Sequence, residues 1–457
     1  MTSATPILWF SVLAAAVALP FAGCSTRGGG ASPADADAMA ARRPLLDAAT
    51  DGLPPAGTFC SLPGSVVSTA QGITIVPGAT GATFDLTWLG LPVGFCAHYF
   101  ATVRAARQLR FAPGGDLLVA SPTAVTIGGA ANGVGGIVLL QDGDHDGVAD
   151  ANITFLSGVP AVQGLLFANG YLYYQDGKTI RRVPFNPGDR QPSGPSEVAT
   201  TIGAPQAAEH WPKVLDVAQD GTIYVTNASS ENEVCTSARP TFGAIFTLNA
   251  DGSTTEVSKG FRNPIAMRCE KNHNVCLAAE LVRDYSADSG GREKIVPVRQ
   301  GDDWGYPCCA TRNVPYTGAT YQDTGQAPDC SGVGSESASF VVSHTPFGID
   351  FEPGLWPAPW TGRAFVTLHG EASTWKGARL VGIALDPDTG LPLPATELDG
   401  GPGNANGLLQ LATGWDDGHM DHGRPAPVAF APDGRLFLGD DQQGAVIWIA
   451  PVALPQR

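Results

Sequence analysis

A short acidic segment has the residue types and the spacing that bind a hard cation. It is Asp142-Gly-Asp144-His-Asp146-Gly-Val148, in which carboxylates alternate with other residues and a glycine follows the third carboxylate. In a calcium loop the side chains at the first, third and fifth positions and the backbone carbonyl at the seventh supply oxygen ligands. The segment therefore predicts a calcium site formed by Asp142, Asp144, Asp146 and the Val148 carbonyl. The alternative is a solvated acidic turn without an ion.

The end of this segment departs from the EF-hand pattern. Ile153 stands where an EF-hand has a bidentate glutamate. The form Asp-x-Asp-x-Asp-Gly-x-x-Asp instead resembles the calcium hairpin loops of integrin-type propellers, and this resemblance implies that Asp150 completes the site. We expect a structural role for such an ion, because it ties a hairpin at the edge of a blade.

A second group consists of histidine and arginine residues next to the ends of apolar, strand-forming runs. His210 precedes the run that begins at Val214, and Arg262-Asn263 precedes the run that begins at Ile265. His369, Arg379 and Arg424 stand at similar places further along the chain. Each alone is most simply a polar loop residue. Brought together, they would surround a planar ligand with several negative charges, which guanidinium groups bind through forked hydrogen bonds.

The elements that must position these residues form a repeat of an apolar run, a turn and a second apolar run. Six copies cover residues 109–120, 165–174, 214–225, 265–277, 347–367 and 428–438. The spacing of the first turn glycines, Gly115, Gly170 and Gly221, is about 50 residues, which is typical of β-propeller blades. We predict an all-β fold, a six-bladed β-propeller with long inter-blade loops over about 283–345 and 386–425. Equivalent strand ends would then meet at one mouth of the central channel.

Two segments resemble motifs of the glucose/sorbosone dehydrogenase family, the soluble quinoprotein sugar dehydrogenases. Gly260-Phe-Arg-Asn-Pro264 is similar to the GxRNP motif of that family, and Asp302-Asp-Trp-Gly-Tyr-Pro307 is similar to its NYGWP loop. The similarity extends over roughly residues 90–450.

This resemblance implies a site and a reaction. The cofactor would be pyrroloquinoline quinone (PQQ), held with a calcium ion over the channel mouth. His210 matches the catalytic histidine, which acts as general base on the anomeric hydroxyl of a sugar while hydride passes to the quinone. Arg262 and Asn263 match residues that contact the cofactor, and Arg379 and Arg424 match basic residues of the later blades. The implied partners are a small sugar substrate and an electron acceptor in the cell envelope.

Two other functions stay open at this point. One is a cofactor-free propeller that binds carbohydrate or protein, because Trp211-Pro212-Lys213 departs from the family pattern after the catalytic histidine. The other is a calcium-dependent lactonase-type propeller, which needs Glu, Asn and Asp ligands at the channel centre.

Composition supports the fold class and excludes one class of partner. The chain has 57 glycines and 37 prolines, and both residues destabilise helix interiors. The formal net charge is −16, and no lysine- or arginine-rich block occurs. A nucleic-acid partner is therefore not expected, because phosphate neutralisation needs clustered basic side chains.

The amino terminus predicts export. Residues 7–19 are apolar except for Ser11, and Phe21-Ala-Gly-Cys24 is similar to the lipobox of bacterial lipoproteins. We expect a signal peptide over 1–23, acylation of Cys24, a flexible tether over 24–53 and a folded body over 54–457. The protein would then contact the bacterial cell envelope (periplasm or outer membrane) through its lipid anchor only. An uncleaved anchor is the alternative, although the apolar run is shorter than the ~20 residues that span a bilayer.

Eight cysteines remain after Cys24, an even number that suits an exported, disulfide-bonded protein. Cys269 and Cys276 flank a short turn, so we predict a disulfide across that hairpin. The other pairings cannot be assigned from the sequence.

Overall fold

The protein is described here from a computed structural model, which covers residues 59–78, 84–123, 133–202, 210–229, 234–238, 243–282, 287, 290–397, 405–419 and 421–453. The chain divides into two compact units, Met1–Leu45 and Leu46–Arg457, and every described residue belongs to the second unit. The signal peptide, Cys24 and the tether lie outside the described residues, so these remain predictions.

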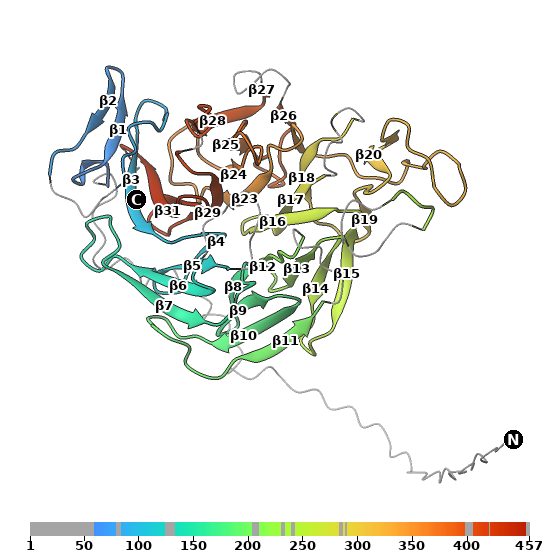
Figure 1. The fold of residues 1–457 in the computed structure, drawn as a ribbon, viewed down its shortest axis with the longest axis horizontal. Helices are drawn as coiled ribbons and strands as arrows, with labels where there is room; N and C mark the ends of the chain where they lie inside the picture. The colour runs from blue at the N-terminus through green and yellow to red at the C-terminus, as the bar shows by residue number, and fades with distance from the viewer. Residues whose placement is uncertain are drawn as a thin grey trace, which may run out of the picture. The chain divides into compact units, whose positions relative to one another are not determined.

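The second unit is a six-bladed β-propeller, as predicted (Figure 1). Each blade has consecutive antiparallel strands, the first of which lies nearest the central axis, and the third and fourth blades add a parallel pair of strands at the outer edge. The first blade contains β4 (Gln108–Phe111), β5 (Leu117–Ser121), β6 (Gly136–Gln141) and β7 (Ala151–Ser157). The second blade contains β8 (Leu165–Ala168), β9 (Tyr171–Asp176), β10 (Thr179–Pro184) and β11 (Glu197–Thr201). The third blade contains β12 (Leu215–Val217), β13 (Ile223–Asn227), β14 (Ala244–Leu248) and β15 (Thr254–Lys259), with β19 (Asp302–Asp303) parallel to β15 on its outer edge.

Of the last three blades, the fourth and the sixth have additional strands. The fourth blade contains β16 (Asn263–Glu270), β17 (Val275–Leu281), β18 (Glu293–Pro297), β22 (Ala338–Phe340), β26 (Ala395–Glu397) and β27 (Ala405–Asn406), of which β22 and β26 form the parallel pair. The fifth blade contains β23 (Pro346–Phe351), β24 (Arg363–Leu368), β25 (Arg379–Ala384) and β28 (Leu408–Ala412). The sixth blade contains β29 (Pro425–Phe430), β30 (Leu436–Asp440), β31 (Ala445–Pro451), β3 (Phe95–Thr102), β1 (Val66–Thr69) and β2 (Gly72–Ile75). A separate hairpin joins β20 (Cys309–Thr311) to β21 (Val314–Pro315), and a short 3-10 helix, η2, covers Phe59–Ser61.

All six predicted repeats fall on the first two strands of a blade. The turns between these strands need backbone conformations that glycine adopts without strain, and Gly221 and Gly434 have φ angles of 89° and 91°. Both predicted long loops contain strands of the blades: β18 and β22 lie within 283–345, and β26, β27 and β28 lie within 386–425, so these two predictions are wrong in part. Their short apolar runs are separated by glycine- and proline-rich stretches, which hide the strands from a reading of local pattern.

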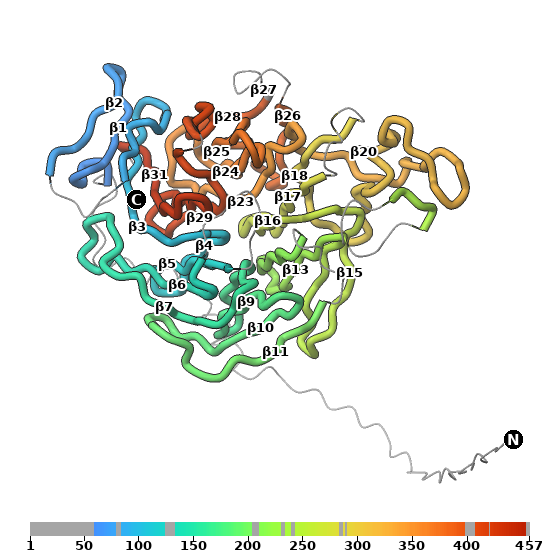
Figure 2. Tube along the Cα trace, viewed as in Figure 1, coloured from blue at the N-terminus to red at the C-terminus, as the bar shows by residue number. Residues whose placement is uncertain are grey.

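The inner strands form a closed ring. Contacts run from β4 to β8, β12, β16, β23, β29 and back to β4. The ring is closed by β3, from the start of the described chain, which pairs antiparallel with β31, from its end, in a register that joins Phe95 to Pro451 and Thr102 to Ala445. Figure 2 shows these two segments, far apart in sequence, lying side by side.

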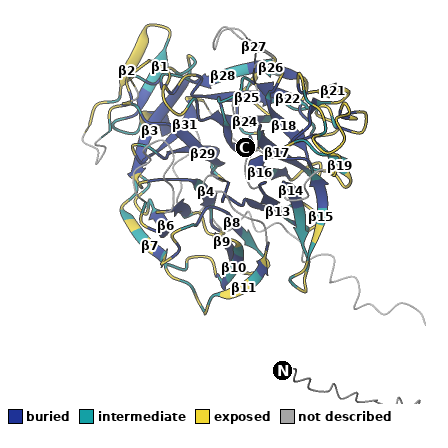
Figure 3. Cartoon of the chain, turned by 45° about the vertical axis from the view of Figure 1, so that its right-hand side comes forward, coloured by how far each residue is buried: buried dark blue, intermediate teal, exposed yellow. Residues whose placement is uncertain are grey.

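The core lies between the blades. The strands β5, β30 and β31 are buried along their whole length, because each is covered by a neighbouring blade on both faces, whereas the outer strands β2 and β11 are largely exposed (Figure 3). Within the described residues, no helix is long and apolar enough to cross a membrane.

Candidate active site

Polar side chains gather at the face of the propeller where the inner strands begin, hereafter the mouth. The second strand of each blade ends at the same face, because it runs antiparallel to the first. The buried polar residues of this face come from all six blades: Arg107, Gln163, His210, Lys213, Asn227, Arg262, Asn263, Glu280, His344, His369, Arg424, Asp440 and Asp441. Burying a polar group without a partner is costly, so the pairings among them define what the site can bind.

The backbone of Ser229 links His210 to Arg262. His210 Nδ1 lies 3.1 Å from the carbonyl oxygen of Ser229, and the backbone N–H of Ser229 donates to the carbonyl of Arg262 at 2.7 Å. A carbonyl only accepts hydrogen bonds, so Nδ1 carries the proton and the neutral ring has its basic lone pair on Nε2. The structure therefore places the predicted base next to the predicted cofactor-binding arginine.

β17 and β18 contribute three buried charged residues, Glu280, Glu293 and Lys294. Glu280 accepts a hydrogen bond from the backbone N–H of Arg262 at 2.6 Å and lies opposite Lys294 in the β17–β18 register. Burial raises the pKa of Glu280 and lowers that of Lys294. Burial also raises the pKa of Glu293 to about 8, against the opposing effect of the backbone donors Ser343 and Thr345. Glu280 thus holds the Arg262 backbone, whereas Glu293 binds the backbone of Ser343 and Thr345, and none of the three residues was predicted.

Arg424 belongs to a second cluster, formed by the fifth, sixth and first blades. His369 Nε2 lies 2.9 Å from Asp441 Oδ1, and Arg107 also pairs with Asp441. The Arg424 guanidinium donates to the carbonyl of His369 at 3.1 Å and lies over the Trp375 ring at 4.7 Å. Burial would raise the pKa of Asp441, but His369 and Arg107 hold it well below its usual range. Burial, followed by the charge of Arg424, lowers the pKa of His369 to about 4, so near pH 7 its ring is neutral and the positive charge that Asp441 matches comes from Arg107 and Arg424.

Arg379 lies in a third cluster and is already paired. Its guanidinium donates to Glu397, whose carboxylate also accepts from His344 Nδ1 at 2.9 Å. Burial would raise the pKa of Glu397, but the hydrogen bond from His344 and the charge of Arg379 lower it to about 2. The backbone links this cluster to the second one, because Gly370 N–H donates to the carbonyl of His344 at 3.0 Å.

Several buried polar atoms at the mouth have no hydrogen-bond partner among the described residues. Arg107 Nε and Arg379 Nε are donors of this kind, and Asn263 Oδ1, Glu280 Oε2 and Asp440 Oδ2 are acceptors. The donors suit a ligand that brings acceptor oxygens. The carboxylate oxygens are of the type that calcium prefers. The mouth therefore fits an anionic ligand together with a hard cation.

The central channel is too narrow to take such a ligand. Between Gln163 at the mouth and Arg268 near the opposite face, the inner strands leave a cavity of only ≈ 30 Å³. That is room for a few water molecules at most. Arg110 and Arg268, which line this cavity, form ion pairs with inner strands of other blades, with Arg110 3.3 Å from Asp216 and Arg268 2.7 Å from Asp350. A planar cofactor would therefore lie across the mouth and not within the channel.

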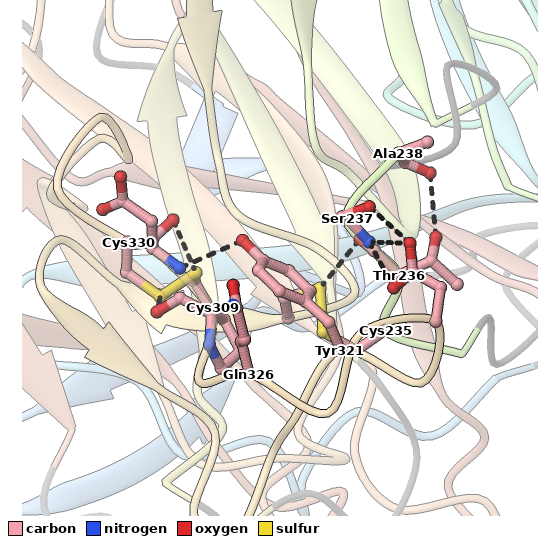
Figure 4. The surroundings of a disulfide bond; sticks show 12 residues. Cys235, Thr236, Ser237, Ala238, Cys309, Tyr321, Gln326 and Cys330 are labelled. Atoms are coloured by element: carbon pink, nitrogen blue, oxygen red, sulfur yellow. Dashed lines mark hydrogen bonds between the residues drawn. A yellow bond between two sulfur atoms is a disulfide. The ribbon is translucent and has the colours of Figure 1, made fainter.

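A disulfide-bonded insertion stands beside Arg262. The segment after β19 follows the end of β15, with Tyr306 N–H donating to the carbonyl of Gly260 at 2.9 Å. From there the chain is held by two disulfides, Cys235–Cys308 and Cys309–Cys330. Figure 4 shows Tyr321 between them, where its hydroxyl accepts from Asp329 N–H at 3.0 Å.

The other predicted residues lie away from the mouth. The Cys269–Cys276 disulfide is confirmed, across the β16–β17 hairpin. The acidic segment from Asp142 to Asp150 forms the β6–β7 turn at the opposite face of the propeller, with one carboxylate oxygen each of Asp142, Asp144 and Asp146 within 4.8 Å of one another. The backbone N–H of Val148 donates to Asp146 at 2.8 Å, and Asp150 accepts from Gly143 N–H at 2.5 Å.

The sequence contains a signal for some of the residues that were missed. Asp440-Asp441 ends an apolar run, as Glu280 does, and charged residues at the inner end of an apolar strand indicate a buried partner. No such signal exists for Glu397, which lies in a short strand of the fourth blade and pairs with residues of the fifth.

Comparison with known proteins shows which solved structures share this fold. A family model described as a domain of unknown function, DUF7133, matches residues 92–279, and no curated protein matches the chain. The propeller is similar to the calcium structure of a Trichoderma reesei carbohydrate-active enzyme of family AA12, at 17% identity and a TM-score of 0.64 over 82% of this chain and 100% of that one.

Two further structures share the fold and hold PQQ by their descriptions. One is the holo PQQ domain of pyranose dehydrogenase from Coprinopsis cinerea, at 14% identity and a TM-score of 0.61 over 82% of this chain and 98% of that one. The other is the PQQ-bound aldose sugar dehydrogenase of Streptomyces coelicolor, at 17% identity and a TM-score of 0.51 over 79% of this chain and 100% of that one. The chain thus has the propeller fold of the PQQ-dependent soluble sugar dehydrogenases, and at these identities the likeness concerns the fold alone.

Proposed function

We propose that the protein is a quinoprotein oxidoreductase that oxidises a sugar or a similar alcohol at the mouth, with PQQ and calcium as cofactors. One observation carries the proposal: the Ser229 backbone fixes the Nδ1-protonated tautomer of His210 and at the same time binds the backbone of Arg262. A base and a guanidinium are thereby held in one unit, which a proton abstraction beside an anionic cofactor requires. The pyranose and aldose named for the neighbouring structures indicate the class of substrate.

The cofactor would be held by Arg262, Asn263 and Arg424, with a smaller contribution from Arg379. PQQ is planar and carries several carboxylates, which guanidinium groups bind through paired hydrogen bonds. Arg379 already neutralises Glu397, and its Nε is the one guanidinium nitrogen without a hydrogen-bond partner among the described contacts. When bound, the quinone would supply the hydride acceptor, which no side chain of the protein can be.

The protein's own part in the reaction is the movement of one proton. His210 Nε2 would take the hydroxyl proton of the substrate, and the resulting imidazolium would keep its Nδ1–H on the Ser229 carbonyl. Because the ring does not have to rotate between the two protonation states, the base stays positioned for the next cycle. Because the surroundings are buried, the hydrogen bond from His210 Nδ1–H to the Ser229 carbonyl is stronger than the same bond would be in water.

The test uses the full-length protein with added PQQ and CaCl2, and measures dye reduction over a panel of aldoses. We expect His210→Ala to lower kcat about 10²–10⁴-fold while PQQ binding, followed by gel filtration and absorbance, is retained. His273→Ala is the matched control, because His273 is exposed in the β16–β17 turn at the opposite face. Wild-type protein that binds no PQQ would refute the proposal, and an unchanged rate in His210→Ala would refute the role of the histidine.

One observation favours a second candidate, a propeller that binds carbohydrate without a cofactor. The positive charges of Arg107 and Arg379 are matched by Asp441 and Glu397, which reduces the charge left for an anionic ligand. If this candidate is correct, calorimetry will detect sugar binding in the absence of PQQ and added PQQ will leave the affinity unchanged.

A further inference from the structure

The β6–β7 turn is folded by its own carboxylates. Asp144 accepts a hydrogen bond from Asp146 N–H at 3.3 Å, and Asp146 accepts from Val148 N–H at 2.8 Å. His145 and Gly147 have φ angles of 59° and 88°, which let the chain wind tightly enough to bring three carboxylates together. One oxygen from each of the three lies within 4.8 Å of the others. Hydrogen bonds of this kind also occur in ordinary acidic turns, so they do not by themselves indicate an ion.

Asp142 supplies the independent observation. Its side chain is only 8% exposed, and neither carboxylate oxygen has a hydrogen-bond partner among the described residues. The nearest cation, the Arg435 guanidinium, is 3.7 Å away and is bound to Asp433 at 2.9 Å. A buried carboxylate without donors is costly, and this one faces two other carboxylates. The arrangement is complete only with a cation among the three.

The same turn is docked against the blade that closes the ring. Trp448 of β31 donates from its indole N–H to the carbonyl of Gly147 at 2.9 Å, and Ala149 N–H donates to the carbonyl of Phe100 in β3 at 2.8 Å. Asn152 reaches the carbonyl of Thr102 at 3.0 Å. The first blade is therefore bound, through this turn, to both strands whose pairing closes the propeller.

We propose that the β6–β7 turn binds a calcium ion through Asp142, Asp144 and Asp146. By fixing the conformation of the turn, the ion would stabilise the contacts between the first blade and the sixth blade, which closes the ring. Carboxylate oxygens in a flexible loop suit Ca²⁺, whereas the smaller Mg²⁺ needs near-octahedral geometry and keeps its water. The site lies on the face opposite the mouth, so this proposal does not rest on the proposed oxidoreductase function.

The first measurement is the thermal unfolding of full-length, PQQ-free protein after treatment with EGTA. Added CaCl2 should raise the melting temperature by about 3 °C or more at a hundredfold excess over Kd, and MgCl2 should raise it less. Asp144→Asn should remove this rise, so that the melting temperature of the variant in CaCl2 equals that of the wild type in EGTA. Asp417→Asn is the matched control, because Asp417 belongs to the other described group of possible ligands, with Asp421 and His422. A melting temperature that calcium does not change in the wild type, or a rise that persists in Asp144→Asn, would overturn the proposal.

A second measurement keeps the test decisive if Asp144→Asn does not fold. Tb³⁺ replaces calcium and emits when a nearby tryptophan is excited, and Trp448 touches the turn. We expect sensitised emission from the wild type, displaced by CaCl2, and its loss in Trp448→Phe. Trp88, which stacks on His422 at 4.2 Å, would be the donor for an ion at the other group. Emission that survives in Trp448→Phe and disappears in Trp88→Phe would therefore refute the site.

Discussion

At the scale of single residues, the mouth is governed by the pairing of buried charges. Asp441 forms an ion pair with Arg107 and a hydrogen bond with His369, and Glu397 forms an ion pair with Arg379 and a hydrogen bond with His344. A buried pair gains little over apolar packing, but removing one partner leaves an uncompensated charge at a cost of about 3–5 kcal/mol. These carboxylates thus fix the positions of the basic side chains and determine how much positive charge faces a ligand.

Glu293 leads to a prediction about pH. Burial raises its pKa to about 8, whereas in the unfolded chain a glutamate loses its proton near pH ~4.3. Between these values the folded state binds more protons, so Glu293 lowers the free energy of unfolding as the pH rises from about 4.5 to 8. Glu293→Gln does not ionise, but it keeps an acceptor oxygen for only one of the Ser343 and Thr345 N–H groups, because these donate to different carboxylate oxygens. We therefore expect a variant whose stability is less sensitive to pH over this window, with a constant loss for the N–H group that has no acceptor.

Urea unfolding of both proteins at several pH values across this window measures the effect. Glu197→Gln is the control, because Glu197 is exposed on β11 and should leave the pH profile unchanged. Parallel pH profiles for Glu293→Gln and the wild type would contradict the assignment.

At the scale of elements, two kinds of disulfide hold the fourth blade and its insertion. Cys269–Cys276 joins paired residues of one hairpin with a sequence separation of 7, whereas Cys235–Cys308 joins segments with a separation of 73. A cross-link restricts the unfolded chain more when it closes a longer loop. The short bond therefore stabilises a hairpin that the strands already form, and the long one positions the insertion beside Arg262.

This difference predicts an order of stabilities. Replacing both cysteines of the hairpin by serine should lower the free energy of unfolding by about 2 kcal/mol, and replacing Cys235 and Cys308 should lower it by about 4 kcal/mol. Denaturant unfolding of the two double variants against the wild type measures the order. Equal losses, or a larger loss for the hairpin, would show that chain entropy does not dominate.

At the scale of the whole molecule, the propeller depends on closure by its two ends. β31 pairs with β30 on one side and with β3 on the other, and it is buried along its whole length. Without it, the sixth blade would expose apolar surface and the ring would be open between β3 and β30.

We therefore expect a chain that ends at Gln443, before β31, to lose the cooperative thermal transition seen by circular dichroism. A chain that ends at Val452 keeps β31 and is the matched control, with a melting temperature close to that of the whole protein. A cooperative transition in the shorter chain would mean that the ring does not need its closing strand.

The local sequence determined the features that depend on neighbouring residues. Six strand–turn–strand repeats, the turn at Gly221, the Cys269–Cys276 bond and the acidic segment were all visible, because strand pairing across a short turn is encoded within about ten residues. From these the blade number and the presence of a mouth could be predicted.

Only the tertiary structure decided which partners meet. Arg107 and Asp441 are 334 residues apart, and Glu397 reaches Arg379 from a neighbouring blade. The remaining disulfides, the register of β3 on β31 and the docking of Gly147 on Trp448 are likewise long-range. Such contacts are set by the packing of whole blades around the axis. A local sequence pattern does not predict which residue of another blade a given side chain will contact. The sequence therefore indicated which side chains have the chemistry, and the closed ring decided which of them act together.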